Sequence, residues 1–267
     1  MPTESFRFPT DGPVHLHLRT NRGTVEVIAD DVSETLVDVS GRHDVGVVRV
    51  SASDDGRQVS VEVPRTWRPG GHPRFDITVR MPAHSTVDLG AASASITTRG
   101  VLAHADAKSA SGNVSIEQVE GDCRAHAASG DIALGTIGGT VDLKSASGDL
   151  RVARVGERCS AKTASGAVDI GWAGDLVSAV SASGDVTVRD AVQGEVICKS
   201  TSGDVSIGVR KGTLVWLDLS TVSGRTTSSL VPEDAPKGGD ERVLTVKAQT
   251  VSGNITISPS GTAAAAA

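Results

Sequence analysis

The sequence is poor in aromatic side chains: its 267 residues include three Trp, three Phe and no Tyr. Its three cysteines form no CxxC pair, so a disulfide framework is not indicated. No stretch approaches the ~20 apolar residues of a membrane-spanning helix, so direct membrane insertion is not expected. The net charge is -6, from 26 Lys and Arg against 32 Asp and Glu. An acidic chain with so few stacking aromatics is not expected to bind nucleic acid.

The N-terminus (MPTESFRF) has no positive segment followed by an apolar run, which a secretion signal would show. Together with the cysteine content, this predicts a cytoplasmic protein. Residues 259–267 end in five alanines and are predicted to be a disordered tail.

A Ser-Gly pair recurs along the chain at nearly constant spacing. The intervals between successive glycines are 18, 18, 18, 18, 19, 21 and 29 residues. A fixed period of this kind is typical of repeat architectures. The eight glycines are Gly112, Gly130, Gly148, Gly166, Gly184, Gly203, Gly224 and Gly253.

Aligned on these glycines, the units have apolar residues at four positions: seven and five places before the glycine, and two and four places after it. The unit of Gly224 is an exception, with Thr226 and Ser228 at the last two positions. In the unit of Gly148 these are Val141, Leu143, Leu150 and Val152. Apolar residues two apart indicate a strand with one buried face. The pattern therefore predicts two short strands in each unit.

Two strands per unit, with like positions above like, predict an all-β fold. We expect a β-solenoid (β-helix) of about nine two-strand rungs, each lying about 4.8 Å above the preceding one. The regular solenoid is predicted over residues 91–258. Residues 1–90 alternate with wider spacing and predict an irregular, antiparallel or mixed β portion that caps it. We expect the repeated glycines to adopt φ > 0 in turns.

A mostly basic column stands four places before the glycines, and a mostly Asp or Asn column stands one place after them. Two interpretations remain open. The columns form a charged stripe that binds a polyanion or a cation, or they are solvated surface whose charges partly offset one another. The candidate interaction residues in the basic column are Lys108, Lys144, Lys162 and Lys199.

Two loops interrupt the pattern, at residues 64–74 and 232–240. The first is basic and contains Arg65, Trp67 and Arg68, which we include among the candidate interaction residues. Insertions in solenoids tend to collect on binding faces, so both loops are candidates for partner specificity.

Catalytic, cofactor and metal sites are not predicted. Cys123, Cys159 and Cys198 occupy inward columns and are interpreted as small buried hydrophobes. His15 and His17 share a strand face without a clear third ligand. The repeated serines are explained by hydrogen bonds to the local backbone rather than by a ligand-binding hydroxyl array. The columns match neither the six-residue pattern of hexapeptide acyltransferases nor the acidic cluster of pectate-lyase-type helices, so we predict no enzyme.

The segment FDITVRMP (Phe75 to Pro82), followed by repeated Ser-Ala-Ser-Gly-Asp-Val units, resembles a bacterial family of β-strand-repeat proteins of unknown function. These proteins are often labelled putative adhesins and are related to the toast-rack domains of envelope-stress proteins. The resemblance covers nearly the whole chain. It implies a β-solenoid with a non-catalytic role in binding or assembly.

The predicted function is that of a non-enzymatic scaffold or adhesin-like interaction protein. It would bind a protein partner or self-associate through its faces or ends, because an uncapped rung exposes unpaired N–H and C=O groups. The alternative is a β-helical binder or enzyme that acts on an anionic polysaccharide through the Lys column.

Overall fold

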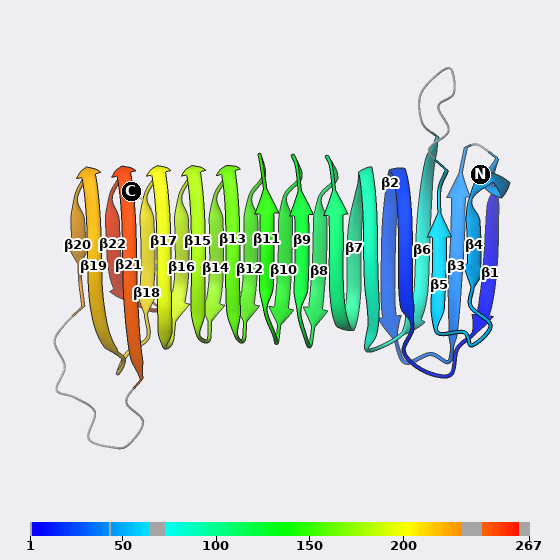
Figure 1. Ribbon diagram of the computed structural model, residues 1–267, viewed down its shortest axis with the longest axis horizontal. Coiled ribbons are helices and arrows are strands. Elements are labelled where there is room, and N and C mark those ends of the chain that lie inside the picture. The colour runs from blue at the N-terminus through cyan, green and yellow to red at the C-terminus, as the bar shows by residue number, and fades with distance from the viewer. Residues whose placement is uncertain (1, 43, 65–72, 231–241, 262–267) are drawn as a thin grey trace. The chain divides into compact units, whose positions relative to one another are not determined.

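The computed structural model describes residues 2–42, 44–64, 73–230 and 242–261 (Figure 1). These residues form strands and a single 3-10 turn, Val45–Val47, which confirms the all-β prediction. None of them lies in a helix that is long and apolar enough to cross a membrane. The chain divides into two compact units, Met1–Ile137 (unit 1) and Gly138–Ala267 (unit 2).

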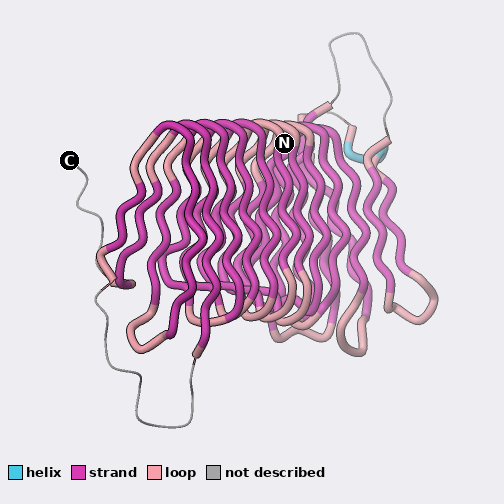
Figure 2. The backbone as a smooth tube through the Cα atoms, turned by 60° about the vertical axis from the view of Figure 1, so that its left-hand side comes forward, coloured by secondary structure: helices cyan, strands magenta, loops and turns pink. Residues whose placement is uncertain are grey.

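Unit 2 is a solenoid in which each rung contributes one strand to each of two layers, and the strands within a layer are parallel (Figure 2). The first layer contains β11 (Val141–Ser145), β13 (Arg158–Ser165), β15 (Leu176–Ser183), β17 (Gly194–Ser202), β21 (Val243–Ser252) and β19 (Leu214–Ser223). The second contains β12 (Leu150–Val155), β14 (Val168–Ala173), β16 (Val186–Ala191), β18 (Val205–Val209), β22 (Ile255–Pro259) and β20 (Thr226–Ser228).

The apolar columns of unit 2 form its core, as the repeat predicts. Val141 pairs with Cys159 in neighbouring strands, Val152 pairs with Ile170, and all four side chains are buried. Because the same position recurs in each rung, aliphatic side chains stack on one another along the unit. This burial of small apolar groups provides the main stabilising term of a fold that has few aromatics.

The order of the last rungs differs from the predicted sequential stack. The rung made by β21 and β22 is the last in the chain, yet it lies between the β17–β18 rung and the β19–β20 rung. The chain therefore passes one rung position, forms β19 and β20, and returns to fill the gap. The stack ends at β19 and β20, not at the last repeat of the sequence.

The repeated glycines are required for a different reason from the one predicted. Among the described residues, none of the Ser-Gly glycines has a positive φ; Gly194, a glycine of the second turn, has φ +85°. A Cβ on Gly184 would lie 2.1 Å from the carbonyl oxygen of Gly166 in the preceding rung. The residue is small because the backbone of the neighbouring rung approaches too closely for any side chain.

Unit 1 combines parallel and antiparallel pairing. Residues 15–29 of β2 pair in parallel with residues 86–100 of β7, whereas the β1–β3, β3–β6 and β4–β5 pairs are antiparallel. The predicted division at residue 90 stays a prediction, and β7 continues through that position. The strands are β1 (Thr3–Pro9), β2 (His15–Asp30), β3 (Glu34–Gly41), β4 (Arg49–Ala52), β5 (Gln58–Glu62), β6 (Arg74–Pro82), β7 (Ser85–Ser109), β8 (Val114–Val119), β9 (Cys123–Ala127) and β10 (Ile132–Ile137).

Candidate interaction surfaces

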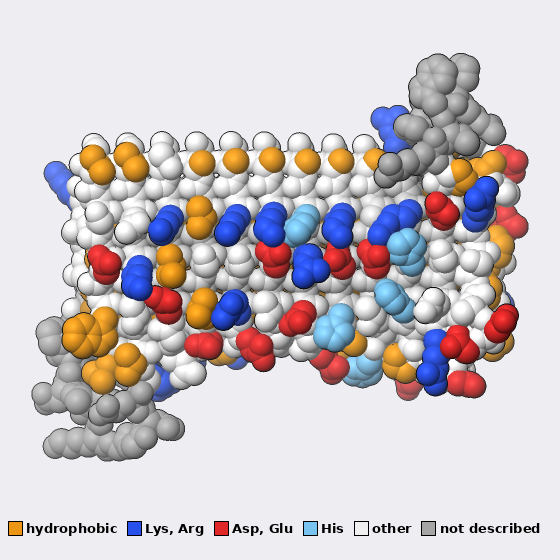
Figure 3. Space-filling view, viewed as in Figure 1, with side chains coloured by type: hydrophobic (Ala, Val, Ile, Leu, Met, Phe, Trp, Pro, Cys, Tyr) orange, Lys and Arg blue, Asp and Glu red, His pale blue; other side chains and the backbone are white. Residues whose placement is uncertain are grey.

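The predicted Lys column lies on the outer faces of β7 and β9 in unit 1 and of β11, β13, β15 and β17 in unit 2. In unit 2, Lys144 is beside Lys162, and Val180 separates Lys162 from Lys199. In unit 1, Lys108 is beside His126. Figure 3 shows basic side chains on the outer face of each unit. The geometry of the column is as expected, and its role in binding stays a prediction.

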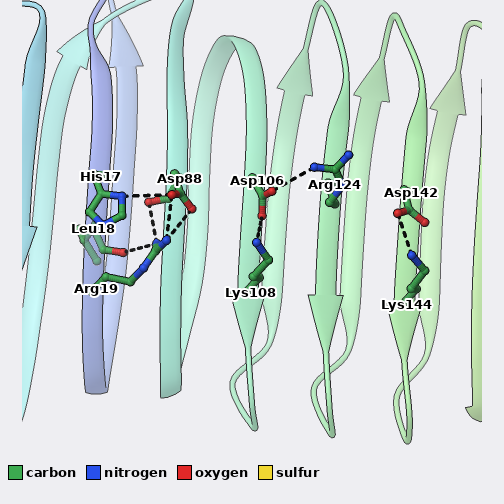
Figure 4. A network of polar contacts seen from close by, with 9 residues as sticks. All are labelled: His17, Leu18, Arg19, Asp88, Asp106, Lys108, Arg124, Asp142 and Lys144. Atoms are coloured by element: carbon green, nitrogen blue, oxygen red, sulfur yellow. Dashed lines mark hydrogen bonds and ion pairs between the residues drawn. The ribbon is translucent and has the colours of Figure 1, made fainter. Parts of the chain in front are cut away.

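Two of the lysines are paired with carboxylates of their own strands. The Lys108 Nζ lies 3.2 Å from Asp106, and the Lys144 Nζ lies 3.0 Å from Asp142 (Figure 4). In both pairs the carboxylate lies two residues before the lysine on the same strand face and does not belong to the Asp and Asn column. The expectation that the Asp and Asn column partly offsets the charge of the basic column is therefore wrong for these two lysines. Lys162 and Lys199 have no acidic partner among the described residues.

The Asp and Asn column connects successive rungs. The Asp185 Oδ1 accepts a hydrogen bond from the Asp204 backbone N–H at 2.8 Å, and the Asp204 Oδ1 accepts one from the Asn254 N–H at 2.7 Å. The same bond joins Asp149 to Ala167 at 2.9 Å. Each of these oxygens satisfies a backbone donor at the turn, which the strand pairing does not reach. The column therefore forms a hydrogen-bond ladder between rungs.

The hydroxyl column three places before the glycine has a similar role. The Thr163 hydroxyl donates to the Gly148 carbonyl at 3.2 Å, and the Ser181 hydroxyl donates to the Gly166 carbonyl at 2.9 Å. This confirms that these hydroxyls bond to the backbone, with the difference that the acceptor belongs to the neighbouring rung. Buried hydroxyls that are bonded in this way are not available to a ligand.

Sequence reasoning missed a polar cluster on unit 1. Arg19 donates to both Asp88 carboxylate oxygens, at 2.9 and 2.8 Å, and the His17 Nδ1 lies 3.1 Å from the same carboxylate (Figure 4). Burial alone would raise the pKa of Asp88, but the hydrogen bonds and charges of Arg19 and His17 hold it below its ordinary value. The separation of about 70 residues hides this cluster from any local motif.

A shallow cavity of about 630 Å³ adjoins this cluster. Its walls include Arg19, Lys108 and Glu62, together with the buried Thr20 and Asn21. The two basic groups among its described walls are each paired with a carboxylate.

The remaining candidates are distributed as follows. Arg65, Trp67 and Arg68, and the loop at 232–240, lie outside the described residues. Within the part of the chain that the structure describes, no three His, Cys, Asp or Glu side chains are placed to hold a metal ion.

In the second layer of unit 2, the Arg154 guanidinium lies 3.9 Å above the Trp172 ring centre. Arg154 and Trp172 occupy the same position in successive 18-residue repeats, so an alignment of the outward-facing positions of the repeat would have found this pair.

The three cysteines are buried and free, which confirms that they are small core residues. Burial raises the pKa of each thiol to about 12, because the thiolate would have to leave water. Neutral thiols in the core are poor nucleophiles.

Exposed apolar side chains concentrate on the last rungs of the unit 2 stack. Trp216 is 73% exposed and Val222 is 81% exposed, both on β19. Leu217, Val243 and Val251, on β19 and β21, are 40%, 44% and 49% exposed. A patch of this kind is typical of an interaction surface.

Comparisons with solved structures find proteins that align with nearly the whole chain. A putative adhesin from Bacteroides fragilis has 14% identity and a TM-score of 0.46, covering 96% of this chain and 97% of that one. A putative lipid binding protein from Parabacteroides distasonis has 13% identity and a TM-score of 0.53, covering 96% of each chain. At this identity the second match shows a shared fold alone.

No curated protein matches the sequence. The Toastrack DUF4097 family matches residues 14–258, which is nearly all of the repeat-bearing chain. The resemblance seen in the repeated Ser-Gly-Asp units is thereby confirmed, and the chain belongs to the Toastrack DUF4097 family.

Proposed function

We propose that this protein is a non-enzymatic, adhesin-like interaction protein that binds a protein partner or a second copy of itself. The observation that carries the proposal is the concentration of exposed apolar side chains on β19 and β21, because such side chains lower their free energy when a partner covers them. The adhesin descriptions of structural neighbours are in keeping with this role.

Two further observations support a binding role over catalysis. Repeated polar side chains such as Thr163, Asp185 and Asp204 form hydrogen bonds between rungs, which gives them a structural role. The cysteine thiols are buried and their pKa values are raised, so they do not supply a reactive thiolate at neutral pH.

The experiment is capture of partners on the immobilised full chain, followed by binding measurements with each purified candidate. A specific protein that loses affinity when Trp216 or Val222 is changed to Lys supports the proposal. Binding that is unaffected by both changes, with catalytic turnover of a captured molecule, would overturn it. The cytoplasmic location expected from the sequence stays a prediction.

The second candidate function is recognition of an anionic polysaccharide. It is favoured by Lys162 and Lys199, whose charges have no acidic partner among the described side chains. Replacing both with Ala would then weaken binding to an anionic polymer and reduce its salt dependence. The matched control replaces Lys108 and Lys144, which are paired with Asp106 and Asp142. Equal effects of the two double variants would reject a specific role for the unpaired lysines.

A further inference from the structure

The terminal rung of unit 2 presents two free strand edges. Among the described residues, β19 pairs with β21 alone and β20 pairs with β22 alone. Every other long strand of unit 2 in the same layer as β19, from β13 to β21, has a strand on each side. The outer N–H and C=O groups of β19 are therefore available to pair with another strand.

The side chains of β19 do not protect this edge. Leu217 is 40% exposed, whereas its neighbour in β21, Val246, is completely buried. Terminal repeats that face water usually have polar side chains at such positions. β20 follows this rule with Thr226 and Ser228, both exposed, but β19 carries Leu217 and Leu219 toward the interior and Trp216 on its outer face.

We propose that the β19–β20 rung binds the same rung of a second copy of the chain, forming a closed two-fold dimer. This inference rests on the proposed self-association and specifies its surface. A second copy is favoured because the rung has an edge in each layer. A single peptide strand would pair with either β19 or β20, and Leu217 and Leu219 would remain exposed to water on the side of the unpaired strand. The β19–β20 rung of a second copy covers both strand edges at once.

The size of the surface indicates a weak contact. A ten-residue strand is about 33 Å long and two packed sheets are about 10 Å apart, so the end of the rung covers roughly 330 Å² per copy. The dimer would bury roughly 660 Å² in total, less than the ~1,000 Å² of a stable specific interface, so we expect it to form reversibly and at high protein concentration.

The two-fold axis makes β19 antiparallel to its copy, and the side chains select the register. When Leu219 lies opposite Leu219 of the second copy, Trp216 lies opposite Val222 and Asp218 lies opposite Ser220. This register pairs the two most exposed apolar side chains and keeps Asp218 away from its own copy. Directly opposite side chains of an antiparallel pair are in contact, so the arrangement covers Trp216 and Val222 together.

Closure at two copies is favoured over an open polymer. A polymer would need β19 to pair with a different edge, and the β1 edge carries Glu4 and Arg7 and ends at Pro9. Charges and proline oppose strand addition at an edge. Association through the two β19 edges is therefore expected to stop at the dimer.

The test is light scattering behind size-exclusion chromatography over a wide concentration range. The full chain is expected to approach twice its 27.2 kDa mass and to go no further. The double variant Trp216→Lys/Val222→Lys places like charges opposite each other and should raise the dimer dissociation constant by about tenfold or more. The control Ala182→Lys/Thr201→Lys adds two charges at exposed positions of β15 and β17, outside the apolar patch, and should leave it nearly unchanged.

The variant Trp216→Glu/Val222→Lys tests the register, because it places opposite charges in the same two contacts and should recover most of the lost affinity. A chain that stays monomeric at every concentration overturns the dimer. The proposed function is then judged separately by capture of other proteins. A mass that continues to grow beyond two copies overturns the closed arrangement, and failure of the charge pair to restore association overturns the register.

Discussion

At the scale of single residues, the repeated glycines hold the rungs at their spacing, because the carbonyl of one rung occupies the place of a Cβ in the next. Gly184→Ala would bring its Cβ to 2.1 Å from the Gly166 oxygen. We expect it to lower the free energy of unfolding by about 2 kcal/mol or more, measured by urea denaturation. The control is Gly46→Ala, where the nearest atom is a side-chain oxygen at 3.2 Å. Equal losses in the two variants would show that the close approach is not the cause.

The Asp88 cluster predicts a pH-dependent contribution to stability. The pKa of Asp88 lies below its usual 3.8, so the carboxylate stabilises the fold above that pH and the effect is lost as the pH falls below it. Asp88→Asn should lower the free energy of unfolding by about 1 kcal/mol at neutral pH. The difference between variant and wild type should disappear in strong acid. A difference that persists at low pH would mean that packing, not charge, is responsible.

The cysteines predict a clear reactivity pattern. With thiol pKa values of about 12 and complete or near-complete burial, Cys123, Cys159 and Cys198 should resist a thiol reagent at mildly alkaline pH. All three should react after denaturation, as followed by mass spectrometry. Rapid labelling of the folded chain would show that the rungs open locally.

At the scale of elements, the position of a strand in the stack, not its position in the sequence, determines how well its backbone amides are protected from hydrogen exchange. β21 has a strand on each side, whereas β19, which precedes it in the chain, is at the end of the stack. At concentrations where the chain is monomeric, amide hydrogen exchange should therefore be slower in β21 and β22 than in β19 and β20. Faster exchange in β21 than in β19 would contradict the rung order. The strands β17 and β18 provide an internal reference for a fully covered rung.

At the scale of the whole molecule, association should couple to stability. If the β19–β20 rungs pair, the midpoint of thermal unfolding rises with protein concentration, because binding favours the folded state by mass action. We expect a rise over about a hundredfold range of concentration for the wild type, and a smaller rise for Trp216→Lys/Val222→Lys. Scanning fluorimetry measures both. Identical concentration dependence in the two proteins would place the contact elsewhere.

The amino-acid sequence by itself determined the two-strand unit, its buried columns and the family. Side chains that alternate with a period of two report which face of a strand is buried, and a constant interval reports that units stack on one another. Val141, Leu143, Leu150 and Val152 occupy the interior positions that the repeat predicts. The column of lysines was predicted in the same way.

The tertiary structure alone decided the order of the last rungs, the reason for the glycines and the partners of the lysines. The cost of closing a long connection grows slowly with its length, so a 29-residue interval permits more than one stacking order. The possible stacking orders differ in which apolar side chains they bury. Ile255 and Ile257 need a covered position, whereas the polar Thr226 and Ser228 tolerate the end of the stack. Contacts between rungs, such as the carbonyl beneath Gly184, exist only after the strands have stacked.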